Sequence, residues 1–328
     1  MTARVEVLSC GPLITVQDRG RPGYLHLGLA RGGAADRRAL DEAMALLGRD
    51  GAGFELQASA ARLRTTEATS VALTGRPMRA ALEGRGLRWG ACHDLGPGQV
   101  LEVRPEGAGY SYLHFGGGLL GDPVMGSLSA HAIAGIGRTL RGGDAIAFRP
   151  RRVPARALLD APDRFDGGVL RCVPGPQTRL FPAEEITRFL ATIFVRDPRG
   201  NRQGVRLDFE GPGFETADQL GLLSDFILPG DVQMTGDGTP FVLGPECQTT
   251  GGYPRIATVI EADLPRAMQA PPGARISFRM VDRAEALAAR PGPPAAVPLV
   301  RDPRDMDDLL SHQLVSGVVS ATDSGGES

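Results

Sequence analysis

The chain has 328 residues, with 36 basic and 38 acidic side chains and a formal charge of −2. This length exceeds one average domain and suits two, each able to bury a core of its own. Acidic and basic residues are interspersed, so the chain lacks the basic surface that nucleic acid or an anionic membrane requires, and we expect neither as a partner.

The cysteines and the N-terminal sequence bear on the compartment. Cys10, Cys92, Cys172 and Cys247 lie far apart and form no CxxC pair, so we expect reduced thiols and no metal site. The first residues lack the apolar core of a secretory signal, and no stretch approaches the roughly 18 apolar residues of a membrane-spanning helix. The expected location is the cytoplasm.

Turn residues dominate the local pattern. The chain has 45 glycines and 26 prolines, many in adjacent pairs between short apolar runs, which is typical of a β-rich protein with many hairpins. Several of these runs alternate apolar and polar residues, as half-buried strands do. The strands expected, in chain order, are Arg4–Leu8, Thr69–Thr74, Val100–Arg104, Tyr110–Phe115, Ala145–Arg149, Val169–Val173, Asp208–Glu210, Phe241–Leu243, Ile256–Ile260 and Ala274–Met280.

Only a few segments have helical spacing. Arg37–Leu47 places its apolar residues on one face, and Ala183–Ala191 follows a proline that commonly opens a helix. Shorter helices are expected at Leu264–Gln269 and Arg283–Arg290. A final helical turn at Asp305–Leu310 is expected before a strand at Val315–Val319.

A turn glycine followed by alternating residues and an arginine occurs three times, beginning at Gly98, Gly143 and Gly273. Each copy indicates a turn that leads into a half-buried strand. The proline-containing segments Pro150–Gly168 and Pro291–Pro298 are typical of linkers. The sequence therefore predicts a mostly β protein with domains at 1–155 and 156–290, followed by a linker and tail at 291–328.

Three polar, glycine-rich clusters are candidates for chemistry. In the first, residues 15–24, Gln17 can contact an amide with both donor and acceptor, and Arg21 can pair with a carboxylate or phosphate. A tight turn whose charges pair with one another is the alternative. His26 lies beside this cluster and is the histidine best placed for acid–base or positioning work.

The second and third clusters lie in the later half. In residues 200–207, Arg202 and Arg206 would face one anion if the segment is a loop; a solvated hairpin tip is the alternative. Residues 248–254 offer an amide, two hydroxyls, a phenol and two glycines, which suits either a cradle for a small polar ligand or a glycine-rich bulge. The chain has no GxxxxGK[ST], HExxH or GxSxG motif.

An ordered set of short motifs covers about the first 290 residues. It runs from Gly11-Pro12-Leu13 and Thr15–Tyr24, through Gly33–Asp36 and Gly116–Gly118, to Gln248–Pro254. With these motifs the chain resembles the biotin-dependent carboxyltransferase-like family, which includes allophanate hydrolase subunit 2, the KipI antagonist KipA and the C subunit of 5-oxoprolinase. The resemblance implies two cyclophilin-like β-barrel domains with a few short helices.

The resemblance also implies function and partners. The first expectation is a subunit that works with a KipI-like subunit and a LamB/YcsF-like subunit to open the 5-oxoproline lactam to glutamate, with ATP used by the complex. The second is a carboxyltransferase subunit that uses biotin carried on another chain to act on an amide or urea. The third is a non-catalytic binding partner of a KipI-like kinase inhibitor. No cofactor is expected to be covalently bound.

Site roles follow from the same resemblance, because these chemistries must hold and polarise a small planar amide. The residues assigned to catalysis are Arg202, Arg206, Gln248 and Tyr253. The residues assigned to substrate binding are Gln17, Asp18, Arg21, His26, Gln233, Thr249, Thr250, Gly251 and Gly252. Two departures from the family pattern, Gly200-Asn201 for Ser-Asp and Leu128 with Ala130 for Arg and Thr, keep the non-catalytic interpretation open.

Overall fold

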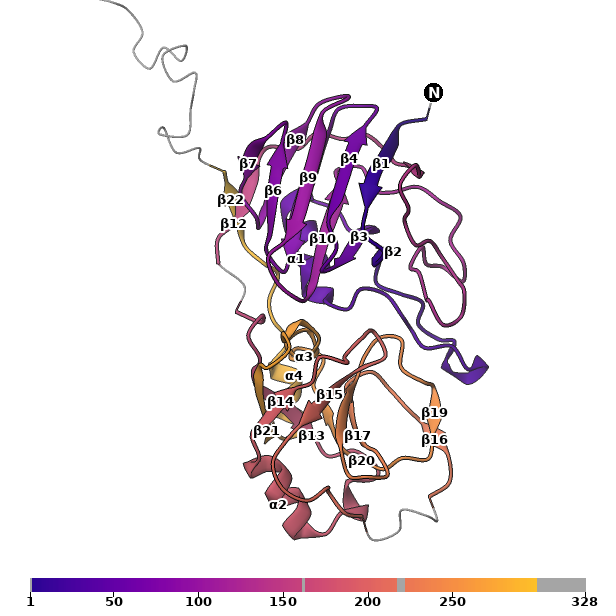
Figure 1. Ribbon diagram of the computed structural model, residues 1–328, viewed down its shortest axis with the longest axis vertical. Coiled ribbons are helices and arrows are strands. Elements are labelled where there is room, and N and C mark those ends of the chain that lie inside the picture. The colour runs from indigo at the N-terminus through magenta and orange to yellow at the C-terminus, as the bar shows by residue number, and fades with distance from the viewer. Residues whose placement is uncertain (1, 161–162, 217–221, 300–328) are drawn as a thin grey trace, which may run out of the picture.

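The computed structural model describes residues 2–160, 163–216 and 222–299. The molecule has two parts stacked along its long axis, an N-terminal part built mainly from strands β1–β11 and a C-terminal part that begins at β13 (Figure 1). The mostly β class predicted from the sequence is confirmed, and the described residues include four short α-helices.

The N-terminal part consists of two antiparallel sheets. One has the strand order β11-β1-β4-β9-β6-β7, and the other has β2-β3-β10-β5-β8-β12-β22. The strands of this part are β1 (Arg4–Cys10), β2 (Ile14–Gln17), β3 (Gly53–Gln57), β4 (Ala61–Thr65), β5 (Thr69–Gly75), β6 (Met78–Leu82), β7 (Arg85–Leu87), β8 (Ala91–Leu95), β9 (Val100–Pro105), β10 (Tyr110–Phe115), β11 (Ala145–Ala147), β12 (Arg156–Leu158) and β22 (Ala296–Pro298).

The core of this part lies between the two sheets. In β4 the side chains alternate between buried and exposed, because one face meets the core and the other meets solvent. Every residue of β5 is buried, since the helix α1 (Arg37–Leu47) covers the face that is turned away from the core. The Asp36 side chain caps α1 by accepting from the Ala39 amide, and Gly48 ends it in the left-handed conformation.

The C-terminal part is a closed barrel with the strand order β13-β20-β17-β18-β15-β14-β21. A separate two-stranded ribbon, β16 with β19, lies beside it (Figure 1). The elements of this part are β13 (Gly168–Val173), α2 (Ala183–Ala191), β14 (Phe194–Arg196), β15 (Gly204–Asp208), β16 (Asp225–Phe226), β17 (Asp231–Met234), β18 (Pro240–Leu243), β19 (Thr250–Gly251), β20 (Arg255–Val259), α3 (Leu264–Gln269), β21 (Arg275–Met280) and α4 (Arg283–Ala288).

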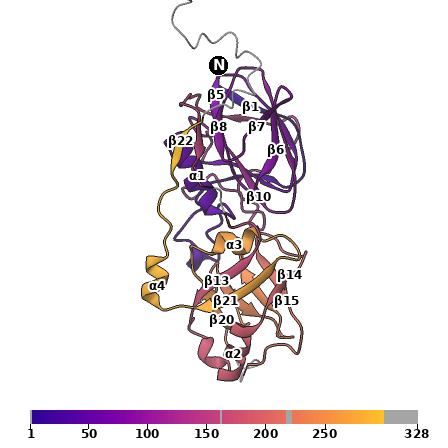
Figure 2. The same ribbon diagram turned by 90° about the vertical axis from the view of Figure 1, so that its left-hand side faces the viewer.

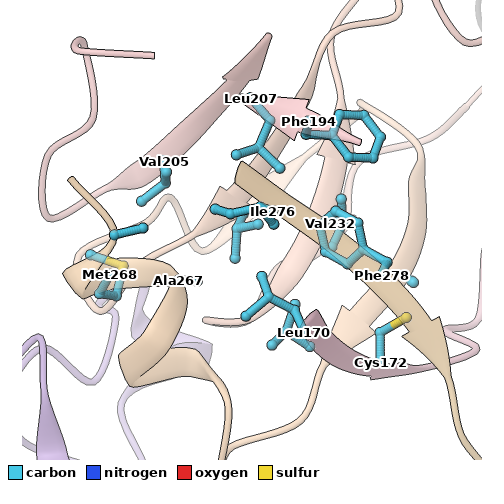
Figure 3. Packing of buried hydrophobic residues seen from close by; sticks show 14 of the residues in the cluster. Leu170, Cys172, Phe194, Val205, Leu207, Val232, Ala267, Met268, Ile276 and Phe278 are labelled. Carbon is cyan, nitrogen blue, oxygen red and sulfur yellow. The ribbon is translucent and has the colours of Figure 1, made fainter. Parts of the chain in front are cut away.

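Apolar side chains from the barrel strands fill its interior. Figure 3 shows Leu170, Val205, Leu207 and Ile276 among the packed residues, all nearly inaccessible to solvent. Alternate residues on these strands therefore point outward, and Gln233, between buried Val232 and Met234, is one of them.

The two parts share one apolar cluster. Ala34, Ala39 and Leu40 of the N-terminal part pack in the same cluster as the barrel residues, together with Tyr110 and Tyr112 of β10. The contact between the parts is therefore a continuation of the barrel core. This apolar packing holds the polar side chains at the edge of the contact in position.

Most of the predicted elements correspond to observed ones. The helices Arg37–Leu47, Ala183–Ala191 and Leu264–Gln269 have the predicted bounds, and the last predicted helix ends at Ala288 instead of Arg290. Gly98, Gly143 and Gly273 all have positive φ and precede strands β9, β11 and β21, as the recurring pattern predicted.

Some expectations were wrong in detail. The predicted strand Asp208–Glu210 is displaced, because Val205 and Leu207 enter the barrel core and the strand runs from Gly204 to Asp208. The N-terminal strands form two sheets, whereas the strands of the C-terminal part form a closed barrel. The segment predicted as a linker contains β12, which pairs with β8 and β22, so the chain returns to the N-terminal part beyond both predicted boundaries. The tail elements predicted at 305–310 and 315–319 lie outside the described residues.

Candidate functional site

Arg202 lies between the two parts and is surrounded by acceptors. Its Nε donates to Glu246 at 2.6 Å, its Nη1 to Glu55, and its Nη2 to the Gly33 carbonyl at 2.6 Å. Burial lowers its pKa, but Glu55 and Glu246 more than offset this, so the pKa is raised and the guanidinium stays charged. With its side chain only 11% exposed, Arg202 is engaged in joining the parts.

Glu55 extends this network into the N-terminal part. Its second oxygen accepts from the Tyr112 hydroxyl at 2.6 Å and from the Ala35 amide at 2.8 Å. The Tyr112 hydroxyl in turn accepts from the Asp36 amide at 2.8 Å. The buried charges are thus matched by donors on both sides of the contact.

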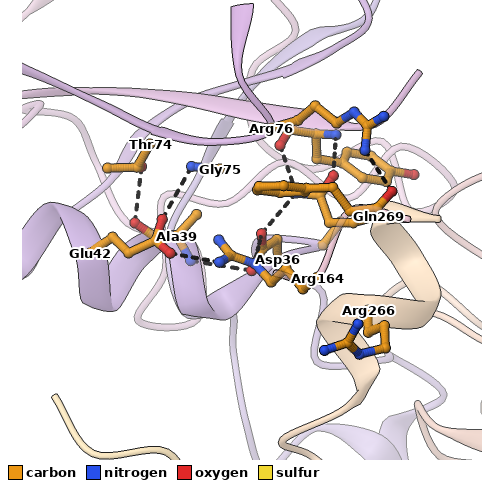
Figure 4. Close-up of polar contacts among 12 residues, drawn as sticks. Asp36, Ala39, Glu42, Thr74, Gly75, Arg76, Arg164, Arg266 and Gln269 are labelled. Carbon is orange, nitrogen blue, oxygen red and sulfur yellow. Dashed lines mark hydrogen bonds and ion pairs between the residues drawn. The ribbon is translucent and has the colours of Figure 1, made fainter. Parts of the chain in front are cut away.

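A second buried network lies nearby and is drawn in Figure 4. Arg164 donates to Asp36 and to Glu42, both at 2.6 Å, and Gln269 donates from Nε2 to Asp36 at 2.8 Å. Burial raises the pKa of Glu42 in spite of Arg164. Arg164 comes from the predicted linker, so its ion pairs anchor this segment to the N-terminal part, and Gln269 of α3 connects the network to the C-terminal part.

The first polar cluster is a tight turn that binds a neighbouring loop. Asp18 accepts from the Ser127 hydroxyl at 2.6 Å, from the Leu128 amide at 2.7 Å and from the Gly20 amide at 2.8 Å. Gln17 is fully buried and donates to the Ala130 carbonyl at 3.2 Å. Leu128 and Ala130 make these contacts through their backbones, so the departures from the family pattern at these positions leave the contacts intact.

Arg21 and His131 form a small niche beside this turn. Both side chains are buried, and within the described residues Arg21 Nη1 and His131 Nε2 have no hydrogen-bond partner. A Cβ built on Gly32 would lie 3.5 Å from Arg21 Nη1 and 3.4 Å from the His131 ring. Burial lowers the pKa of both groups, although nearby Glu246 opposes the shift at each. His26 is exposed on the outer side of the turn.

The second cluster does not converge on one anion. Arg206 points away from Arg202 along β15 and forms ion pairs with Asp197 at 3.6 Å and Asp208 at 3.3 Å. Asn201 accepts from the Gln203 amide at 2.7 Å and forms part of the turn before β15. The two arginines therefore belong to separate networks, each neutralised by its own carboxylates.

The third cluster borders a cavity on the outer face of the barrel. The cavity has a volume of about 220 Å³, and Ile227, Phe241, Leu243 and Cys247 form its apolar part. The polar residues that line it are Arg199, Asn201, Gln203, Gln233, Thr235, Gln248 and Tyr253. Gln233, Gln248 and Tyr253 were predicted as site residues, and the fold brings them together here.

Gln233 Nε2 is the distinctive group of this cavity. It is buried and has no partner within the described residues, although a buried amide N–H without a partner costs free energy. A Cβ on Gly251 would lie 3.5 Å from this nitrogen and 2.6 Å from Ile227 Cδ1, so a side chain at position 251 would enter the space in front of it. The arrangement suits a ligand that presents a carbonyl oxygen.

Cys247 also lines the cavity, but its chemistry differs from that of a nucleophile. Burial raises the pKa of its thiol to about 12, with a smaller contribution from Asp231. At neutral pH it stays protonated, whereas cysteine nucleophiles act as thiolates. The cavity is therefore equipped to bind and polarise a ligand.

The ribbon that carries the third cluster is held by Arg255, which sequence reasoning missed. Arg255 is buried on β20, where it forms ion pairs with Asp225 at 2.5 Å and Asp231 at 3.2 Å and donates to Gln177 at 3.1 Å. Asp225 belongs to β16, which pairs with β19, and β19 contains Thr250 and Gly251. No motif marked Arg255, because its partners lie in distant segments.

The predicted site residues thus divide into three places. Gln17, Asp18 and Arg21 lie at the turn between the parts, Arg202 and Arg206 lie in structural ion-pair networks, and Gln233, Gln248 and Tyr253 line the cavity. Thr249 is buried, Thr250 and Gly251 form β19 of the ribbon beside the cavity, and Gly252 follows directly after it. Glu55, Glu246 and His131 had no distinctive sequence signal.

These features define a two-part β protein with a small polar-lined cavity on one barrel. Residues 27–280 match the family described as carboxyltransferase domain, subdomain A and B, and the chain belongs to that family. Among the described residues, no helix is long and apolar enough to cross a membrane.

Relatives of known name are similar over most of the chain. The C subunit of the 5-oxoprolinase of Escherichia coli (strain K12) is 34% identical over 293 residues, which cover 87% of this chain and 94% of that protein. The urea amidolyase of Lachancea kluyveri is 25% identical and is covered over 18% of its length. The crystal structure of TTHA0988 matches with a TM-score of 0.74 and 33% identity, and the match covers 85% of this chain and 56% of that one.

Proposed function

We propose that this chain is the C subunit of an ATP-dependent 5-oxoprolinase, a complex that opens the 5-oxoproline lactam to glutamate. The similarity to a protein of that name extends over nearly the full length of both chains. The partners would be a KipI-like subunit and a LamB/YcsF-like subunit, and ATP would be used by the complex. The cytoplasm is the expected location of such an enzyme.

The observation that carries this proposal is the unpartnered Gln233 Nε2 in the barrel-face cavity. A lactam presents a carbonyl oxygen, and a preorganised N–H aimed at that oxygen stabilises the charge that develops when the carbonyl is attacked. Gln248 and Tyr253, at the rim, supply further donors. The cavity, with a volume of about 220 Å³, has room for a five-membered ring and its substituents.

The substrate carboxylate would be bound by Arg199 at the cavity rim. Arg199 is exposed and held in position by Asp197, to which its Nε donates at 2.8 Å. A guanidinium can form paired hydrogen bonds to a carboxylate with the N–H groups that remain. Arg202 would act on the substrate site indirectly. It connects Glu246, just before the third cluster, to the Gly33 carbonyl of the N-terminal part, and so holds the start of that cluster in position.

Carboxyl transfer to an amide is the second candidate, favoured by the family match. Biotin would then be carried by another chain, and the carbonyl oxygen of an amide or urea substrate would accept from the same Gln233 N–H. A third possibility is binding of a KipI-like partner without turnover. In that case the partner would bind the protein surface, and the cavity would hold no substrate.

The test is ATP-dependent formation of glutamate from 5-oxoproline by the complex reconstituted with the cognate KipI-like and LamB/YcsF-like subunits. Gln233→Met removes the N–H and keeps the side-chain length, so we expect kcat/KM to fall about 100-fold, as when an oxyanion-hole donor is removed. Gln57→Met, at a half-buried glutamine on β3 of the other part, is the matched control and should retain activity.

Each outcome separates the candidates. Absence of turnover from an assembled wild-type complex would contradict the 5-oxoprolinase proposal. The same complex would then be assayed for carboxyl transfer from biotin to urea. Full activity of Gln233→Met would contradict the placement of the substrate in this cavity.

A further inference from the structure

The niche formed by Arg21 and His131 is a second place where buried donors have no partner. It lies at the boundary between the two parts, which Figure 2 shows stacked one on the other. The Gly32 amide donates to the Pro245 carbonyl at 3.0 Å, and the Ala132 amide donates to the Glu246 carboxylate at 3.1 Å. Segments of both parts therefore border the niche, and it plays no part in the proposed function.

Arg21 brings a positive charge into the niche without a carboxylate in contact with it. The residue is only 1% exposed. Its Nε donates to the Val124 carbonyl at 3.4 Å and its Nη2 to the Ser129 carbonyl at 2.5 Å, while Nη1 has no partner within the described residues. Backbone carbonyls satisfy N–H groups but carry no net charge. A buried cation is costly unless an anion contacts it, so an anion bound at Nη1 would stabilise the fold.

The two carboxylates whose charges act on Arg21, Asp18 and Glu246, are engaged by other donors. Asp18 accepts hydrogen bonds from its own turn and from the neighbouring loop. Glu246 accepts from Arg202 with one oxygen and from a backbone amide with the other. Their charges lessen the cost of burying Arg21, but neither carboxylate contacts Nη1. This nitrogen therefore remains available to a further anion.

His131 contributes the second donor. The residue is 4% exposed, and its Nδ1 accepts from the Ala134 amide at 3.3 Å. Burial lowers the pKa of the ring, Glu246 opposes the shift and Arg21 adds to it, so the ring is neutral at neutral pH. A neutral imidazole whose Nδ1 accepts carries its proton on Nε2. Nε2, which has no partner within the described residues, is therefore an N–H donor.

The two unpartnered donors border one small space beside Gly32. A Cβ built on Gly32 would lie 3.5 Å from Arg21 Nη1 and 3.4 Å from His131 Cδ2, the carbon bonded to Nε2. Apart from Gly32 and its two neighbours in the chain, no other heavy atom of the described residues lies within 4 Å of that position. The φ of Gly32 is +62°, which residues with a side chain rarely adopt, so glycine keeps this space open.

These features favour a small monovalent anion as the ligand. Two N–H groups that face the same space need an acceptor between them, and the charge of the guanidinium favours an anionic one. A water molecule matches less well, because it also donates and usually makes about three hydrogen bonds when buried. Both donor atoms are closed to solvent, so a monatomic anion suits the niche better than phosphate or a substrate carboxylate.

We propose that Arg21 and His131 bind a chloride ion beside Gly32. The ion accepts from Arg21 Nη1 and His131 Nε2 and supplies a negative charge in contact with the buried guanidinium. Because Gly32 is hydrogen-bonded to Pro245, the ion lies where the two parts meet and stabilises their contact. This inference is independent of the proposed enzyme activity.

Bromide tests the position of the ion, because it replaces chloride and is located by its anomalous X-ray scattering. Crystals of the full chain grown in sodium bromide should show an anomalous peak within hydrogen-bond reach of Arg21 Nη1 and His131 Nε2. The wild-type chain is sufficient for this measurement. Bromide that appears only at other positions, with water between the two donors, would be an adventitious ion only and would overturn the proposal.

Urea unfolding tests the affinity in solution, at about pH 8, where histidines are neutral. Chloride is raised at constant ionic strength, with gluconate, an anion too bulky for the niche, making up the difference. Once chloride exceeds its Kd, each tenfold rise should lower the unfolding equilibrium constant about tenfold, because the ion binds only the folded chain. An unfolding constant that does not respond to chloride would contradict the proposal.

Two histidine variants assign the response to the niche. His131→Phe keeps a ring but removes the N–H, so it should weaken chloride binding about tenfold or more. His114→Phe is the matched control, because His114 is also buried with an Nε2 that has no partner among the described residues. Its chloride response should equal that of the wild type. An unchanged response in folded His131→Phe would place the anion at other donors, and if this variant does not fold, the bromide position in the wild type decides.

Discussion

The contact between the two parts and the barrel-face cavity use similar polar residues in opposite ways. At the contact, Arg164 and Arg202 each face two carboxylates, and Glu55 accepts from Arg202, Tyr112 and a backbone amide. In the cavity, Gln233 Nε2 is buried and meets no acceptor among the described residues. Polar groups that satisfy one another hold a fold together, whereas a buried donor left over is available to a ligand.

The comparison changes how the arginines are interpreted. An arginine in a glycine-rich loop resembles an anion-binding residue when only the sequence is known. In the structure, Arg202 already has its anions, and removing it would leave Glu55 and Glu246 buried without a counter-charge. Loss of activity in a variant of this residue would therefore report on folding as much as on chemistry.

The largest expected effect breaks the contact. Arg202→Ala should lower the free energy of unfolding by about 3–5 kcal/mol, because it leaves buried carboxylates unpaired. Urea unfolding of the isolated chain measures this. Arg62→Ala is the control, since Arg62 is 53% exposed in its pair with Glu102 and such pairs contribute less than about 1 kcal/mol. Equal losses for the two variants would contradict the structural role of Arg202.

The sequence was sufficient to predict elements whose signals are local. Arg37–Leu47 has amphipathic spacing, an aspartate cap and a terminal glycine, and Tyr110–Phe115 is a continuous strand-forming run. The partners of Arg202 are 147 and 44 residues away, at Glu55 and Glu246. No local pattern links such residues, so the networks of the contact appear only when the chain is folded.

The same reasoning explains which of the predicted residues the fold brings together. Gln248 and Tyr253 belong to one dense polar motif, and they do line the cavity. Arg199 and Cys247 also line it but stand outside any recognisable motif, and His131 became notable only through its position beside Arg21 and Gly32. The strand at Gly204–Asp208 was misplaced because its outward and inward residues could not be distinguished without the barrel.

His114 tests whether every unpartnered buried atom marks a ligand site. Its Nε2 has no partner among the described residues, but the ring is packed in β10 beside Tyr112 and against Gly53, away from the cavity. Burial lowers its pKa from 6.5 to about 4. The folded chain therefore holds the ring neutral, while the unfolded chain takes up a proton as the pH falls below about 6.5.

This shift predicts a pH-dependent stability. Between pH 6.5 and pH 4 the His114 ring should remove on the order of 3 kcal/mol from the free energy of unfolding, and this loss is absent above pH 6.5. His114→Phe cannot take up a proton and should have a shallower slope over this range. Urea unfolding at several pH values gives a stability curve for the wild type and one for His114→Phe. The carboxylates contribute equally to both curves, so the difference between the curves reports on His114. Parallel curves would show that the His114 ring is not held neutral. The missing partner of its Nε2 would then need another explanation.

The smallest expected effect concerns two adjacent glycines beside the cavity, Gly251 at the end of β19 and Gly252 directly after it. A Cβ at Gly251 points at Ile227 and toward Gln233 Nε2, whereas a Cβ at Gly252 meets, among the described residues, the Leu222 carbonyl at 3.4 Å and the Ser224 hydroxyl at 4.0 Å. Neither glycine has positive φ, so alanine fits the backbone at both positions. The two substitutions thus add the same methyl group on opposite sides of the cavity wall.

If the space before Gln233 holds the substrate, Gly251→Ala should raise KM for 5-oxoproline about tenfold, because one misplaced methyl group in a pocket has an effect of that size. Gly252→Ala should leave KM unchanged. Both variants should unfold at nearly the same urea concentration, since Ile227 is a flexible side chain that can rotate away from the new methyl group. Steady-state kinetics of the reconstituted complex separates them. Equal KM values would mean that the substrate does not approach Gln233 from this side, and the unpartnered N–H would then be a cost of folding with no ligand to offset it.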